Sequence, residues 1–135
     1  MAKMIFVNLP VKDLPGSMAF YTALGFTNNP QFTDNTAACM VWSDAIYVML
    51  LTHDKWKSFT SRPIPPATSS EVMVALALDS RADVDAICKA GATHGGTADV
   101  NPAQDHGFMY QRSIADLDGH LWEPFWMDPA AIPKG

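Results

Sequence analysis

The chain has 135 residues, of which 48% are hydrophobic and 17% are charged, a composition typical of one globular domain and too apolar for a disordered segment. Its formal net charge is −5, and it has no basic cluster that could bind a nucleic acid or an anionic membrane. No apolar run is long enough to span a bilayer, and the first ten residues lack a signal-peptide pattern. We therefore expect a single cytoplasmic domain over residues 1–135, with Cys39 and Cys88 as buried free thiols.

The first half of the chain begins with a β-rich run over residues 4–9. Asp13 is a suitable N-cap for a helix from Leu14 to Leu24, and Gly25 stands where a left-handed residue would end it. The apolar spacing predicts a buried helix face made by Leu14, Met18 and Tyr21, with Phe20 and Leu24 beside it. Further strands are expected near Phe26, over 36–42 and over 45–52.

The second half repeats this order of elements. Residues 72–78 predict a strand, and Ser80 predicts the N-cap of a helix that ends at Gly91. The apolar stripe of this helix consists of Val84, Ile87 and Cys88. Two more strands, 106–115 and 120–127, are predicted to form a hairpin around the turn 116–119.

These patterns indicate two β-α-β-β-β units in tandem rather than one continuous array. Unit one covers about 1–53 and unit two about 71–128. The proline-rich stretch of about 54–70 between them is expected to be a surface linker or a lid.

Two motifs resemble the vicinal oxygen chelate superfamily, which includes glyoxalases, bleomycin-resistance proteins, fosfomycin-resistance enzymes and extradiol dioxygenases. They are residues 9–26, which run from the first strand through the helix, and the sequence Asp-Leu-Asp-Gly-His-Leu-Trp-Glu at 116–123. The resemblance implies an α+β fold, in which two tandem β-α-β-β-β units form a cupped, mostly antiparallel eight-stranded sheet with helices outside. It also implies a homodimer, with or without exchanged units, and it implies no single reaction.

In metal-dependent members of this superfamily, each unit supplies two ligands to a divalent cation. The motif alignment places Phe6, Leu50, Met73 and Glu123 at these positions. Three of the four are apolar, and one carboxylate alone does not hold a catalytic metal ion tightly. We therefore expect no metal site and no cofactor, with Glu123 as the only matching ligand position.

Pairing the last two strands around the turn 116–119 places Arg112 opposite Glu123 on one face of the sheet. This predicts a structural ion pair between them, with a substrate-handling or acid/base role for Glu123 as an alternative and metal ligation as another. His106 is a second candidate catalytic residue, because Asp105 beside it would orient its imidazole if the segment were a turn.

Strand alternation then selects the residues expected to line the cup. The predicted ligand-binding residues are Phe6, Asn8, Leu50, Met73, Tyr110, Arg112, Glu123 and Phe125. Such a lining predicts a small-molecule-binding protein without the divalent-metal site, whose ligand is an apolar compound with a polar or anionic handle. The alternatives are a metal-dependent lyase or dioxygenase of glyoxalase type, and a dimeric scaffold whose cup is filled by side chains.

Overall fold

A computed structural model describes residues 3–131 of the chain and divides it into two compact units that meet between Ser69 and Ser70. The expected linker contains a helix, α2 (His53–Phe59), which packs against strands of unit 1. Thr52 caps this helix by accepting a hydrogen bond from the Lys55 amide at 3.3 Å. Only residues 60–72 connect the units without a helix or strand.

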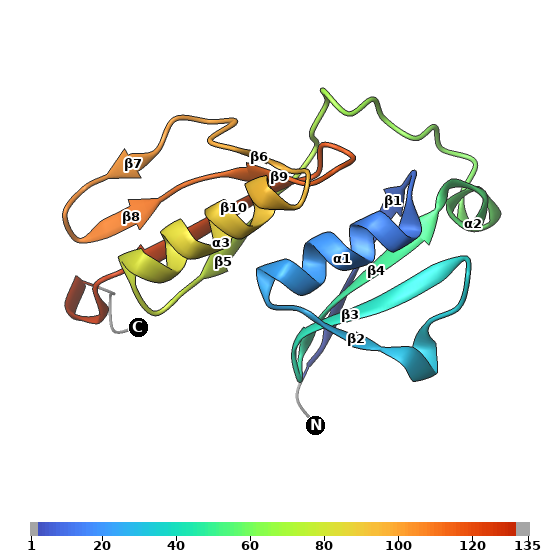
Figure 1. Cartoon of the computed structure of the whole chain (residues 1–135), viewed down its shortest axis with the longest axis horizontal. Coiled ribbons are helices and arrows are strands. Elements are labelled where there is room, and N and C mark those ends of the chain that lie inside the picture. Colours follow the sequence, from blue (N-terminus) through green and yellow to red (C-terminus); the bar gives the residue numbers. More distant parts are fainter. Residues whose placement is uncertain (1–2, 132–135) are drawn as a thin grey trace. The chain divides into compact units, whose positions relative to one another are not determined.

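Unit 1 contains one four-stranded sheet and the helix α1 (Figure 1). Its strands lie in the order β1-β4-β3-β2, in which only β1 and β4 run parallel. Before α2, its elements are β1 (Ile5–Val11), α1 (Leu14–Leu24), β2 (Thr27–Asn29), a 3-10 turn (Pro30–Phe32), β3 (Ala37–Ser43) and β4 (Ile46–Thr52).

Helix α1 has the predicted bounds, and both predicted caps are confirmed. The Asp13 carboxylate accepts a hydrogen bond from the Gly16 amide at 3.1 Å, and Gly25 has a left-handed φ of 110°. The buried helix face differs from the predicted one, because Ser17 belongs to it and Met18 is only half-buried. The fully packed members of this face are Leu14, Ser17, Phe20, Tyr21 and Leu24.

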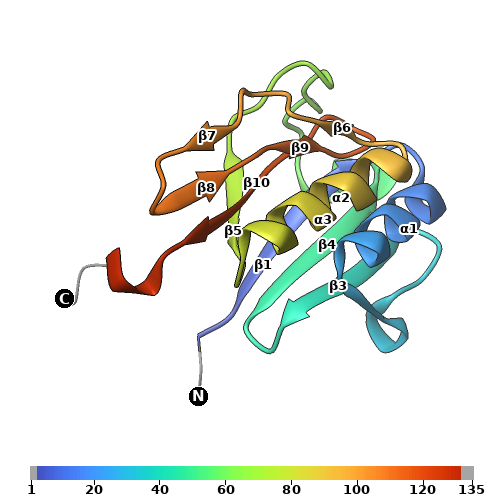
Figure 2. The ribbon, with the colours of Figure 1, turned by 60° about the vertical axis from the view of Figure 1, so that its left-hand side comes forward.

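Unit 2 has a six-stranded sheet with β10 at its centre (Figure 2). Strand β5 pairs with β10 in parallel on one side, and β8 and β9 pair with it in antiparallel on the other. Strands β7 and β6 extend this second side by pairing with β8 and β9. The elements are β5 (Met73–Ala77), α3 (Arg81–Thr93), β6 (Thr97–Ala98), β7 (Gln104–Asp105), β8 (Met109–Gln111), β9 (Ile114–Ala115), β10 (Leu121–Met127) and a 3-10 turn (Pro129–Ala131).

The two units share one topology, since in each the first strand runs parallel to the last and the remaining pairs are antiparallel. The α+β class and the mostly antiparallel pairing are therefore confirmed. The described residues form ten strands rather than eight because β6 with β7, and β8 with β9, each replace one longer strand. The structure places them in two sheets of four and six strands.

Helix α3 covers one face of the unit 2 sheet and contacts β10. Ser80 is its N-cap, accepting a hydrogen bond from the Asp83 amide at 3.0 Å, and the predicted stripe of Val84, Ile87 and Cys88 is buried. The helix ends at Thr93, two residues beyond the predicted stop at Gly91, which is itself buried. None of the helices within residues 3–131 combines the length and apolarity that a membrane crossing needs.

Candidate functional site on the unit 2 sheet

The turn between β9 and β10 sets the register of the last hairpin. The Asp116 amide donates to the His120 carbonyl at 3.0 Å, so that three residues, Leu117 to Gly119, form the loop. Gly119 has a φ of 85°, which is the left-handed last residue that three-residue loops favour. The predicted turn 116–119 would pair residue 115 with residue 120, whereas Ala115 pairs with Leu121, so the register is offset by one residue.

Because of this offset, the predicted pairing of Arg112 with Glu123 is wrong. The Arg112 amide donates to the Pro124 carbonyl at 3.1 Å, and Gln111 lies opposite Phe125. Side chains alternate between the two faces of a strand, so a shift of one residue moves a side chain to the other face. Arg112 and Tyr110 therefore face α3, whereas Glu123 projects from the opposite face.

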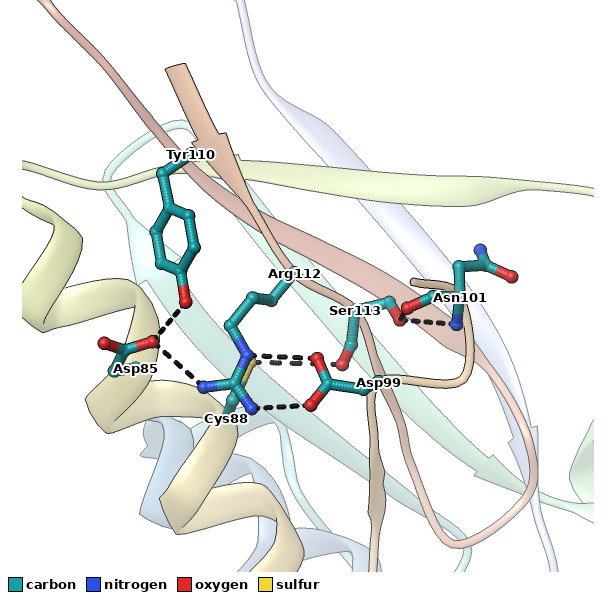
Figure 3. A network of polar contacts seen from close by, with 7 residues as sticks. All are labelled: Asp85, Cys88, Asp99, Asn101, Tyr110, Arg112 and Ser113. Atoms are coloured by element: carbon teal, nitrogen blue, oxygen red, sulfur yellow. Dashed lines mark hydrogen bonds and ion pairs between the residues drawn. The ribbon is translucent and has the colours of Figure 1, made fainter. Parts of the chain in front are cut away.

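On the α3 side, Arg112 and Tyr110 belong to a polar network that joins the helix to the sheet (Figure 3). The guanidinium binds both oxygens of Asp99 at 3.0 and 2.8 Å and one oxygen of Asp85 at 3.0 Å. The Tyr110 hydroxyl donates to the same Asp85 oxygen at 2.7 Å. Asp99 has a φ of 56°, so its bidentate contact with Arg112 stabilises a backbone conformation that is unfavourable for a residue with a side chain.

The charges of this network compensate one another. The hydrogen bond from Tyr110, followed by that from Arg112, holds the pKa of Asp85 below its ordinary value. The Arg112 guanidinium likewise lowers the pKa of Asp99, and the two carboxylates raise the pKa of Arg112. Burial raises the pKa of the neighbouring Cys88 thiol to about 11, so this sulfur stays protonated at neutral pH. Arg112 is engaged by two carboxylates and braces the unit.

The opposite face of the sheet carries Glu123 among exposed apolar side chains. Glu123 is half-buried and accepts a hydrogen bond from the Gln111 carboxamide at 2.9 Å. Ala75 pairs with Glu123 on β5, and Met73, two residues away on the same face, is 55% exposed. We call the residues Met73, Ala75, Gln111, Glu123 and Phe125 the Glu123 face. Sequence reasoning missed Gln111, although the glycine at position 119 signals the three-residue loop that places Gln111 there.

In unit 1, the corresponding face of the sheet also differs from the predicted lining. Phe6 lies opposite Tyr47 and stacks on it, with ring centroids 4.5 Å apart. Asn8 lies opposite Met49, as Ala75 lies opposite Glu123 in unit 2. Leu50, predicted to share this face, instead pairs with Leu9 and is fully buried in the core. The unit 1 position that corresponds to Glu123 is therefore Met49.

The donor atoms on these faces can be compared with what a divalent cation requires. The first-strand positions are Phe6 and Met73, and the last-strand positions are Met49 and Glu123. Among these four, only Glu123 offers a hard oxygen ligand, whereas such cations take several oxygen or nitrogen donors. This donor set does not fit a tightly bound divalent metal ion.

A different group of ligand-type residues lies in the turn before β10. One ligand atom from each of Asp116, Asp118 and His120 lies within 4.8 Å of the other two. An oxygen of Asp116 accepts hydrogen bonds from the Asp118 and His120 amides at 2.9 and 2.8 Å. This carboxylate therefore shapes the loop that sets the hairpin register.

The predicted Asp105 and His106 couple is not formed. Asp105 makes a bidentate contact with Arg81 at 2.9 Å to each guanidinium nitrogen, and this contact lowers the pKa of Asp105 to about 2. The exposed His106 ring lies 3.3 Å from the Gln104 side-chain oxygen. Asp105 is thus engaged with helix α3 and does not orient the imidazole.

The sequence matches the model of one family, described as Glyoxalase/Bleomycin resistance protein/Dioxygenase superfamily, over residues 3–123. This match covers both units. The chain belongs to this superfamily. No curated protein is matched by the sequence.

Several solved structures share the fold across nearly the whole chain. The hypothetical protein SA1046 from S. aureus is 26% identical with a TM-score of 0.77, and the match covers 93% of this chain and 95% of that one. A glyoxalase-related enzyme from Fulvimarina pelagi is 17% identical with a TM-score of 0.78, covering 100% and 94%. TnmS3, an antibiotic binding protein from Streptomyces sp. CB03234, is 17% identical with a TM-score of 0.63, covering 94% and 97%.

Proposed function

We propose that this superfamily member binds an apolar small molecule bearing a polar handle, and that the Glu123 face of unit 2 contributes to the site. The observation that carries the proposal is one hydrogen-bonded carboxylate, Glu123, set among exposed apolar side chains on a sheet. Binding sites for small molecules combine an apolar lining with a few oriented polar groups, and this face has that composition.

Two further observations support binding rather than a structural role for this face. Met73 and Ala75 are exposed although they are apolar and lie on a strand next to the central one. TnmS3, which shares the fold, is an antibiotic binding protein, and this supports a small organic molecule as the ligand class. A scaffold with a filled sheet face would instead bury these side chains.

The experiment is a screen of small apolar compounds by amide chemical-shift perturbation on the labelled full chain. We expect the shifted amides to include those of β5 and β10, and we expect Met73→Ser to weaken binding because it removes apolar contact surface without adding a charge. Arg112→Lys, on the opposite face, is the matched control and should leave the affinity unchanged. Absence of any binder, or shifts confined to other elements, would refute the proposed site.

We further propose that the site works without a divalent metal ion, because only Glu123 among the four aligned positions offers a hard ligand. Calorimetric titration with nickel, manganese, iron and zinc tests this, with Glu123→Ala and His120→Ala run in parallel. We expect each metal ion to bind weakly, and with the same affinity in the Glu123→Ala variant. Near-stoichiometric binding that depends on Glu123 would favour a metal-dependent lyase or dioxygenase instead, and dependence on His120 would assign the metal to the turn.

The resemblance to dimeric relatives leads us to propose a homodimer acting in the cytoplasm. Light scattering coupled to gel filtration reports the mass directly, and a mass near 14.7 kDa at micromolar concentration would refute the dimer.

A further inference from the structure

We infer that the polar handle of the ligand is a cation or another strong hydrogen-bond donor, such as an ammonium or amidinium group, and that Glu123 is the residue that recognises it. This inference rests on the proposed function and specifies its ligand class. From the sequence we expected a polar or anionic handle, and this inference drops the anionic option because Arg112 lies on the α3 side of the sheet.

The charge of Glu123 has no partner in the described part of the chain. Arg81 pairs with Asp105, and Arg112 pairs with Asp85 and Asp99, so these cations are engaged away from Glu123. The neighbour of Glu123 on this face, Gln111, is neutral and donates one hydrogen bond. A carboxylate in this position attracts a positive group more strongly than a carboxylate that is already paired.

The hydrogen-bonding capacity of the carboxylate is also only partly used. Gln111 donates to one oxygen of Glu123, Oε2, at 2.9 Å, which fixes the orientation of the carboxylate plane. Within residues 3–131, no hydrogen bond to the second oxygen, Oε1, is found. An ionised carboxylate only accepts hydrogen bonds, so a group that binds here must donate them.

The surroundings favour an organic cation over a simple ion. Met73 and Phe125 flank Glu123 on the same face through the β5 and β10 register, and Ala75 is its direct neighbour. Thioether and aromatic groups contact apolar carbon well, and an aromatic ring also attracts a nearby cation. The arrangement therefore suits a compound whose apolar body covers Met73 while its charged end reaches Glu123.

The experiment compares three probes that share one apolar body and differ in the handle: 2-naphthylmethylamine, 2-naphthylmethanol and 2-naphthoic acid. Affinities are measured by chemical-shift titration at pH 7 with the wild-type chain and Glu123→Gln, which preserves shape and removes the charge. Asp44→Asn, an exposed carboxylate in unit 1, is the matched control for the change in net charge.

We expect the amine to bind at least about tenfold more tightly than the alcohol, and the acid to bind most weakly. In the Glu123→Gln variant, the amine should bind no more tightly than the alcohol. Asp44→Asn should leave the affinities of both probes unchanged. Equal binding of amine and alcohol on the Glu123 face would overturn the cationic handle and leave the proposed function standing. Preferential binding of the acid would also overturn it, and failure of all three probes to shift β5 and β10 would count against both proposals.

Discussion

Arg112, which lies between β8 and β9, and Glu123, which lies on the neighbouring strand β10, project from opposite faces of the unit 2 sheet. Arg112 binds Asp85 and Asp99 on the side of helix α3, and Glu123 binds Gln111 on the other side. The three-residue loop before β10 offsets the register by one residue from the predicted pairing and causes this separation. Arg112 therefore joins a network that stabilises the fold, and Glu123 is the carboxylate that we propose to bind the ligand.

The first prediction separates these two roles. Arg112→Ala removes three charge-assisted hydrogen bonds and leaves two carboxylates close together, so the free energy of unfolding should fall by about 1–3 kcal/mol. The exposure of both aspartates keeps the loss toward the lower end of this range. Urea denaturation measures it. Glu123→Gln should cost little stability, and a larger loss for Glu123→Gln than for Arg112→Ala would contradict the division.

The second prediction concerns acid stability. The pKa values of Asp85, Asp99 and Asp105 are lowered in the folded chain, whereas an aspartate in the unfolded chain has a pKa of about 3.9. A lowered folded pKa gives stability that is complete above the unfolded value and is lost as the pH falls through the folded one. Stability should therefore fall between about pH 4 and about pH 2, the value for Asp105.

Urea midpoints at several pH values in this range provide the measurement. Arg81→Met should make the fall shallower, because it removes the group that lowers the pKa of Asp105. Arg62→Met, an exposed residue between the units, is the control. Parallel pH profiles for the wild type and Arg81→Met would show that the ion pair contributes nothing to acid stability.

The third prediction concerns Ser17 in helix α1. Its side-chain hydroxyl is buried without a hydrogen-bond partner among the described residues, and the residue is 1% exposed. Burying such a group costs about 1 kcal/mol or more, so Ser17→Ala should raise the free energy of unfolding by about that amount. Ser58→Ala, at an exposed position of α2, controls for helix propensity. A loss of stability in Ser17→Ala would mean that the hydroxyl has a partner.

The fourth prediction concerns the two thiols. Burial raises the pKa of Cys39 and raises that of Cys88 to about 11, so both are protonated and shielded at pH 8. A thiol-reactive disulfide reagent should label neither quickly in the native protein and both after denaturation. The variants Cys39→Ala and Cys88→Ala assign each signal. Rapid native labelling that disappears in Cys88→Ala would contradict the burial of Cys88 on the sheet-facing side of α3.

The fifth prediction tests the loop that fixes the register. Gly119 has a φ of 85°, so Gly119→Ala should cost about 1 kcal/mol, whereas Gly119→Asn should cost less because Asn tolerates this conformation. Gly96, whose φ is not positive, provides the control variant Gly96→Ala. Cross-strand contacts between the amide of Arg112 and β10 report the register, and a shift of one residue in Gly119→Ala would show that the loop conformation controls it.

The sequence by itself determined the local elements and the family. Asp13 and Gly25 cap helix α1 at the predicted residues, and Ser80 begins α3 as expected, because caps depend on neighbouring residues only. The order of predicted helices and strands along the chain, together with the motif at 116–123, was likewise sufficient to predict the α+β fold class. Periodicity also placed Glu123 and Phe125 on one face, since alternation along a strand is a local property. Met73, on another strand, was placed there by the motif alignment.

Only the tertiary structure decided which side chains meet across strands. The sheet face on which Arg112 and Tyr110 lie depends on the register that the loop 117–119 sets. The sheet face of Leu50 depends on the parallel register of β1 and β4, which no turn fixes. An error of one residue in the register moves every side chain of the strand to the other face, because side chains alternate with a period of two. For this reason Gln111, rather than Arg112, was found beside Glu123. The sequence led us to expect a polar or anionic handle, and the cationic handle is our proposal from the structure.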